Sequence, residues 1–164
     1  MLAVCEERVS VNMGEIRVSR DPRQLLVAYG LGSCICVCAY DPALKLGGML
    51  HALIPERQNG QPVSAKFADV GVKMLIEELE TKGALRQRLI VKLAGGAQVL
   101  AVPGMTGRFD IGARNAEAAL NALSQLGVRP IAKDIGGNMG RTVLMQIHDG
   151  KVTVRFTNGS LREL

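Results

Sequence analysis

The sequence predicts an α+β fold arranged as one domain over residues 1–164. Two stretches have the apolar spacing of helices, whereas the rest of the chain carries short apolar runs bounded by turn residues, as strands do. No linker or low-complexity tract divides the 164 residues. A chain of this length is about one domain and can bury a core without disulfides.

Strands are predicted throughout the first third of the chain. Two of them form a hairpin, because Asp41-Pro42 stops one apolar run and a second run follows at once. This hairpin carries Cys34 at its start and His51 near its end. The predicted strands span 9–19 (a strand, or a hairpin around Gly14), 24–29, 34–40 and 46–54.

Two helices and four more strands are predicted in the remainder, after an exposed polar loop at 56–64. The first helix spans 65–82 and ends at Gly83; in the second, Asn115 is the predicted N-cap of a helix that runs to Leu126. Asp149-Gly150 predicts a hairpin between the last two strands. The strands are expected at 89–93, 128–133, 141–147 and 152–156.

Composition narrows the possible partners. The net charge of +5 suggests an acidic partner, but the basic residues are scattered and the chain has only two tyrosines, three phenylalanines and no tryptophan. Few aromatic side chains argue against binding nucleic acid, so a protein surface rich in glutamate fits better. No signal peptide or membrane span is predicted, which indicates a cytoplasmic protein without membrane insertion.

The sequence Gly30-Leu31-Gly32-Ser33-Cys34 is the strongest indication of chemistry. A cysteine after a glycine-rich turn can act as a nucleophile, and the main-chain N–H groups of Ser33 and Cys34 could hold an oxyanion. His51 follows 17 residues later and is the candidate base, since His148 lies beside the Asp149-Gly150 turn and is expected to be exposed. The alternatives are a buried structural cysteine and a core histidine held by hydrogen bonds.

Neither a metal site nor a cofactor site is predicted. Cys34, Cys36 and Cys38 alternate along one strand, so their sulfurs share a face but are spaced too regularly to converge on one ion. Cys36 and Cys38 are therefore interpreted as core residues. The glycine pairs at 95–96 and 136–137 fit neither the Walker nor the dinucleotide-binding pattern and are interpreted as tight turns.

Ordered blocks of sequence along most of the chain resemble the CheD family of bacterial chemoreceptor glutamine deamidases. The resemblance implies mixed β-sheets packed face to face with helices on the outside. It also implies hydrolysis of glutamine side chains on receptor cytoplasmic helices to glutamate and ammonia, with Cys34 as nucleophile, His51 as base and no cofactor. Chemoreceptors, and a phosphatase of the CheC type, are the implied partners. The matching blocks are Gly30–Cys34 continuing to Tyr40-Asp41-Pro42, Gly47–His51 with Pro55, Lys92–Ala97, Ile111–Asn115, and Asp134–Gly137 with Gly140-Arg141.

The chain departs from the family pattern at one position. The pattern places a threonine five or six residues before the cysteine, where this chain has Ala28 and Tyr29. Alternation along a strand turns Tyr29 away from the face of Ala28. Another residue could orient His51, turnover could be slow, or the protein could bind receptors or a CheC-type phosphatase without catalysis.

Overall fold

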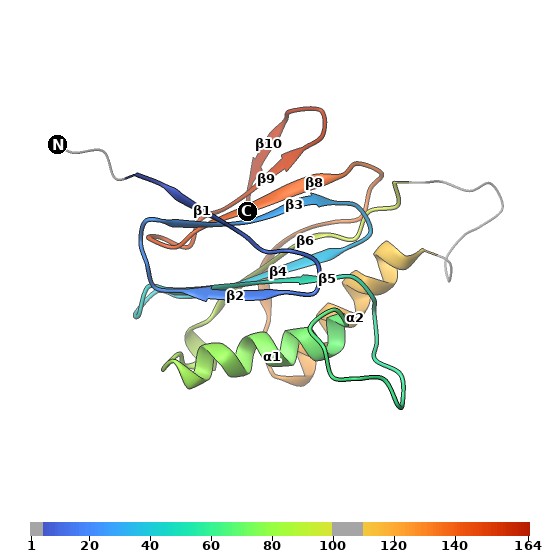
Figure 1. The fold of residues 1–164 in the computed structure, drawn as a ribbon, viewed down its shortest axis with the longest axis horizontal. Helices are drawn as coiled ribbons and strands as arrows, with labels where there is room; N and C mark the ends of the chain where they lie inside the picture. Colours follow the sequence, from blue (N-terminus) through green and yellow to red (C-terminus); the bar gives the residue numbers. More distant parts are fainter. Residues whose placement is uncertain (1–4, 100–109) are drawn as a thin grey trace.

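Two five-stranded sheets and two helices form three layers in the computed structural model, which describes residues 5–99 and 110–164 (Figure 1). In spatial order, one sheet contains β1 (Glu7–Ser10), β3 (Gln24–Leu31), β8 (Arg141–Gln146), β9 (Val152–Phe156) and β10 (Leu161–Glu163). The other contains β2 (Ile16–Ser19), β5 (Leu46–Ala52), β4 (Ile35–Asp41), β6 (Ile90–Gly95) and β7 (Pro130–Ile135).

The helices α1 (Ala68–Thr81) and α2 (Ile111–Gln125) cover the outer face of the β4-containing sheet (Figure 1). Each sheet is mixed, because β1 runs parallel to β3 and β6 runs parallel to β7, whereas the other pairs are antiparallel. The predicted α+β class, with mixed sheets packed face to face and helices outside, is confirmed. Neither helix in the described ranges is long and apolar enough to cross a membrane.

Strand β4 is buried on both faces, which explains its continuous apolar sequence. Ile35, Val37 and Ala39 pack toward the helices, whereas Cys36 and Cys38 pack between the two sheets. The alternation of the strand therefore divides its side chains between two cores. Any side chain of this sheet that shares the face of Cys36 points toward the other sheet.

The predicted hairpin is present as the antiparallel pair β4–β5. Its register sets Cys36 opposite His51 and Tyr40 opposite Gly47. At the end of the hairpin remote from Cys34, the buried Asp41 carboxylate accepts hydrogen bonds from the Ala43 N–H at 3.0 Å and the Leu85 N–H at 3.2 Å.

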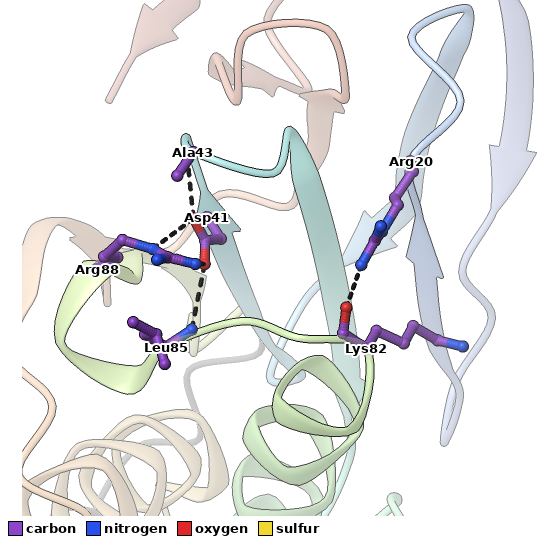
Figure 2. Close-up of polar contacts among 6 residues, drawn as sticks. All are labelled: Arg20, Asp41, Ala43, Lys82, Leu85 and Arg88. Atoms are coloured by element: carbon purple, nitrogen blue, oxygen red, sulfur yellow. Dashed lines mark hydrogen bonds and ion pairs between the residues drawn. The ribbon is translucent and has the colours of Figure 1, made fainter.

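The same carboxylate pairs with Arg88, whose Nη2 lies 2.7 Å from Oδ2, and Arg20 donates to the Lys82 carbonyl nearby (Figure 2). Arg88 closes a 3₁₀ turn, η1 (Arg86–Arg88), between α1 and β6. These bonds anchor the β4–β5 turn to the segment that follows α1. The hairpin is therefore fixed at the end opposite the candidate site.

Two sequence predictions about elements are wrong, and one strand was missed. Residues 9–19 do not form a hairpin: β1 pairs with β3 in one sheet and β2 pairs with β5 in the other, through partners that local sequence does not reveal. The N-cap of α2 is Asp110, whose side chain accepts from the Ala113 N–H at 2.9 Å, so Asn115 lies inside the helix. Strand β10 at the end of the chain was not predicted.

Candidate active site

Cys34 and His51 lie on the same face of the β4-containing sheet. Cys34 directly precedes β4, is half-buried, and packs against the core between the two sheets, as Cys36 does. His51 is paired with Cys36 in the neighbouring strand, so Cys34 is its diagonal neighbour on that face. The structure thus brings the two predicted residues to one end of one face, although no hydrogen bond joins them.

The turn before Cys34 carries the chain from one sheet to the other. Gly30 has φ of +62°, a conformation that side chains rarely adopt, and its N–H donates to Thr142 Oγ1 at 3.3 Å. The register between β3 and β8 shifts between Ala28 and Leu31, as in a β-bulge. The glycine therefore lies at the irregularity in the β3–β8 pairing, which resumes at Leu31 opposite Arg141 before the chain crosses to Cys34.

Three successive carbonyl groups in this turn are held by fixed donors. The Gly32 carbonyl accepts from the Ala97 N–H at 2.9 Å, and the Cys34 carbonyl accepts from the Gly96 N–H at 2.8 Å. Between them, the Ser33 carbonyl accepts from Asn115 Nδ2 at 2.8 Å. The hydrogen bond to each carbonyl oxygen therefore fixes the orientation of its peptide group.

Fixing these carbonyls also directs the N–H groups of the same peptides. In a trans peptide the C=O and N–H point in opposite directions, and the described residues contain no cis peptide. The N–H groups of Ser33 and Cys34 consequently point away from their carbonyl partners, and neither donates to another described residue. They are the two groups that the sequence suggested as oxyanion donors, and both are left without another partner among the described residues.

A main-chain carbonyl orients the imidazole of His51. Nδ1 of His51 lies 2.9 Å from the Val11 oxygen, and since a carbonyl only accepts, Nδ1 carries the hydrogen. Nε2 is then the unprotonated nitrogen, and it is buried without a hydrogen-bond partner among the described residues. His51 thus presents a basic lone pair within a largely buried side chain that is 4% exposed.

The Val11 carbonyl is the orienting group that sequence analysis could not find. Ala28 is fully buried between the sheets and Tyr29 is 47% exposed. This confirms the prediction that the two side chains lie on opposite faces of the strand. Val11 is itself fixed next to Ala28, because its N–H donates to the Val27 carbonyl at 2.8 Å. A carbonyl is present in every residue and gives no signal in the sequence.

Burial favours the neutral forms of both candidate groups. Desolvation raises the pKa of the Cys34 thiol, and the N–H of Cys34 itself opposes this effect. Desolvation lowers the pKa of His51, against the opposing effects of the Val11 carbonyl and the Glu15 carboxylate. The resting site is therefore a thiol beside a neutral imidazole, an arrangement that suits general-base activation better than a preformed ion pair.

The other cysteines of β4 and the second histidine lie where the sequence predicted them, in the core and on the surface respectively. Cys36 and Cys38 are buried between the sheets with their sulfurs 3.9 Å apart, and His148 is exposed. Within 5–99 and 110–164, no group of three or more His, Cys, Asp or Glu side chains is arranged to hold a metal ion. Cys34 and His51 therefore remain the candidate nucleophile and base.

The start of α2 rests directly on the segment that holds the turn. A Cβ atom on Gly112 would lie 2.4 Å from the Ala97 oxygen and 2.5 Å from the Gly96 oxygen, closer than real contacts allow. Only a glycine permits this approach. It brings α2 close enough for Asn115 to reach the Ser33 carbonyl, so the helix is part of the site.

Comparisons with known proteins place the chain in a family. Residues 52–156 match the family described as CheD chemotactic sensory transduction. The chain is 42% identical over 158 residues to a Symbiobacterium thermophilum protein named "Probable chemoreceptor glutamine deamidase CheD", covering 94% of this chain and 96% of that one. It is 41% identical over 149 residues to the "Chemoreceptor glutamine deamidase CheD" of Thermotoga maritima, covering 91% and 92% of the two chains.

A solved structure, that of Bacillus licheniformis hypothetical protein YfiH, aligns over 73% of this chain and 49% of its own, with a TM-score of 0.45 and 12% identity. That likeness is too slight to bear on the site. The family match covers most of the chain, and the relatives match along nearly their whole length. This chain belongs to the CheD family.

Proposed function

We propose that the protein is a protein-glutamine deamidase, which hydrolyses glutamine side chains on the cytoplasmic helices of chemoreceptors to glutamate and ammonia. The observation that carries the proposal is the pairing of a fixed cysteine turn with an oriented, unprotonated Nε2 on the same face of one sheet. The printed names of the CheD relatives support the substrate. The net charge of +5 suits the acidic surface of such helices.

The first half of the proposed reaction forms a thioester. Nε2 of His51 takes the proton of the Cys34 thiol, and the sulfur forms a bond to the amide carbon of the substrate. The electron pair of the C=O bond moves to oxygen, where the N–H groups of Ser33 and Cys34 stabilise the charge. When the C=O bond re-forms, the C–N bond breaks, and His51 gives its proton to the departing ammonia.

The second half returns the enzyme to its resting state. Nε2 of His51 takes a proton from water, whose oxygen bonds to the thioester carbon. The C–S bond then breaks, glutamate leaves, and the Cys34 sulfur recovers its proton from His51. Throughout both halves, the Val11 carbonyl holds Nδ1–H and keeps Nε2 as the nitrogen that carries protons.

A binding protein without useful catalysis is the second candidate, and Ala28 is the observation that favours it. Its methyl group cannot hydrogen bond to the imidazole, as the hydroxyl of the family's threonine would. The Val11 contact weakens this candidate, because the imidazole has an orienting acceptor without that hydroxyl. Docking to a CheC-type phosphatase is a further part of our proposal and rests on the family resemblance. A cytoplasmic location and a single domain over residues 1–164 are also part of it and rest on the sequence.

Mass-spectrometric mapping of receptor cytoplasmic fragments tests the proposed function. We expect the wild-type protein to convert particular receptor glutamines to glutamate. We also expect Ala28→Thr to change the rate modestly, since Val11 already orients His51. A silent wild-type protein beside an active Ala28→Thr variant would instead identify a binding protein derived from an enzyme. Silence of both would rule out the deamidase.

The pH dependence of kcat/KM should show an acid limb below the ordinary histidine pKa of about 6.5. Protonation of Nε2 removes the base, and burial lowers the pKa of His51, so activity should persist below pH 6.5 and fall as the pH drops through the lowered value. Glutamate production on a receptor fragment, followed from acid to neutral pH, measures the limb. A limb centred above 6.5 would contradict the role given to His51.

A further inference from the structure

We infer that Asn115 is a positioning residue of the proposed deamidase, whose side-chain amide fixes the Cys34 N–H as an oxyanion donor. The inference rests on the proposed function and adds to it a residue that acts through its neighbours. Asn115 lies inside α2, fully buried. Asparagine is a poor residue for a helix interior, which calls for another reason for its presence there.

Both hydrogens of the Asn115 amide are used at the candidate site. Nδ2 donates to the Ser33 carbonyl at 2.8 Å and to the Leu53 carbonyl at 2.9 Å. Ser33 immediately precedes Cys34, and Leu53 follows His51 by two residues. One NH₂ group therefore joins the two segments that carry the proposed nucleophile and base.

The bond to Ser33 has a particular consequence for the chemistry. The Ser33 carbonyl and the Cys34 N–H belong to the same peptide, so holding the carbonyl toward α2 turns the N–H the opposite way. This N–H and the Cys34 sulfur belong to the same residue, so the N–H lies close to the sulfur. An N–H beside the attacking sulfur is well placed to donate to the oxygen that becomes negative when the sulfur attacks.

The surroundings of Asn115 indicate that the amide is required, not merely tolerated. Its Oδ1 is buried and has no hydrogen-bond partner among the described residues, which is unfavourable for an amide oxygen. An apolar side chain would avoid that cost but would leave two carbonyls without donors. The close approach of Gly112 to Gly96 and Ala97 also serves the same contact, because it sets α2 at the distance that Asn115 spans.

Two variants test the inference: Asn115→Asp, which keeps the shape but cannot donate when ionised, and Asn115→Ser, which is too short to span both carbonyls. Loss of one oxyanion donor lowers kcat by about 10²–10³-fold, and we expect that loss with KM for the receptor fragment unchanged. Asn121→Asp places the same charge on an exposed position of α2 and should match wild type. Thermal unfolding establishes that each variant is folded.

The rate at which iodoacetamide alkylates Cys34 separates a positioning role from a merely structural one. A general disturbance of the turn would lower this rate, whereas loss of an oxyanion donor would not. Alkylation needs the thiol and His51 but no oxyanion donor, so its rate should stay near that of wild type in both variants. The assay uses a Cys5→Ala background, since Cys5 is exposed and would react as well. Alkylation that falls in parallel with kcat, or a raised KM with kcat unchanged, would overturn the positioning role.

The outcomes separate this inference from the proposed function. An active wild-type protein with folded and fully active Asn115 variants overturns the inference alone. A wild-type protein that converts no glutamine overturns the proposed function, and the inference with it. Active wild type, slow and folded variants, and preserved alkylation support both.

Discussion

Replacing Cys34 with alanine should abolish glutamine conversion, with a loss of about 10⁴-fold or more in kcat. The sulfur is the atom that bonds to the amide carbon, and no other described thiol can substitute for it. Cys36 and Cys38 point into the closed core between the sheets, and Cys5 lies near the start of the chain. Mapping of glutamate in receptor fragments measures the loss.

The matched control for this substitution is Cys38→Ala. It removes a sulfur from the same face of the sheet, four residues further along the chain, and creates a small buried cavity. We expect lower thermal stability but preserved turnover for Cys38→Ala, and unchanged stability with no turnover for Cys34→Ala. Comparable activity of the two variants would remove Cys34 from the mechanism.

Replacing His51 with asparagine should lower kcat by about 10²–10⁴-fold, the usual contribution of a general base. The asparagine amide can place an N–H near the former Nδ1 and continue to donate to the Val11 carbonyl, while Nε2 is deleted. The variant therefore separates the loss of the base from the loss of the buried hydrogen bond. Its remaining rate should rise with pH as the Cys34 thiol, whose pKa burial raises, begins to ionise.

His148→Asn is the control for this experiment. That side chain is exposed beside the β8–β9 turn, at the end of β8 that pairs with the start of β3, whereas Cys34 follows the other end of β3. Its replacement should change neither kcat nor the acid limb. A His51→Asn variant that keeps the wild-type rate and acid limb would show that another group takes the proton of Cys34.

Local sequence was sufficient to predict the hairpin that carries the site. A continuous apolar run, an Asp-Pro turn and a second run define β4 and β5, and their antiparallel register fixes which residues share a face. The placement of Cys34 and His51 on one face follows from those elements. The predicted core positions of Cys36 and Cys38 follow from the same alternation and are confirmed.

The groups that complete the site depend on contacts between distant segments. Val11 reaches His51 because β1 pairs with β3 and not with β2, a choice made by long-range packing. Asn115 resembled an N-cap because asparagine favours helix starts, yet its side chain bonds to carbonyls 62 and 82 residues away. Neither a main-chain acceptor nor a long-range amide contact has a local sequence pattern.

The account depends most directly on a covalent bond between Cys34 and the substrate, and acid-quenched turnover tests it. Wild-type protein is mixed with a receptor fragment and quenched in acid while conversion proceeds. Mass spectrometry then identifies the side chain that carries the covalent adduct, whose added mass is that of the substrate minus one ammonia. The account predicts that side chain to be Cys34, with no adduct in Cys34→Ala. An adduct on another residue, or conversion that continues at the wild-type rate in Cys34→Ala, would contradict it.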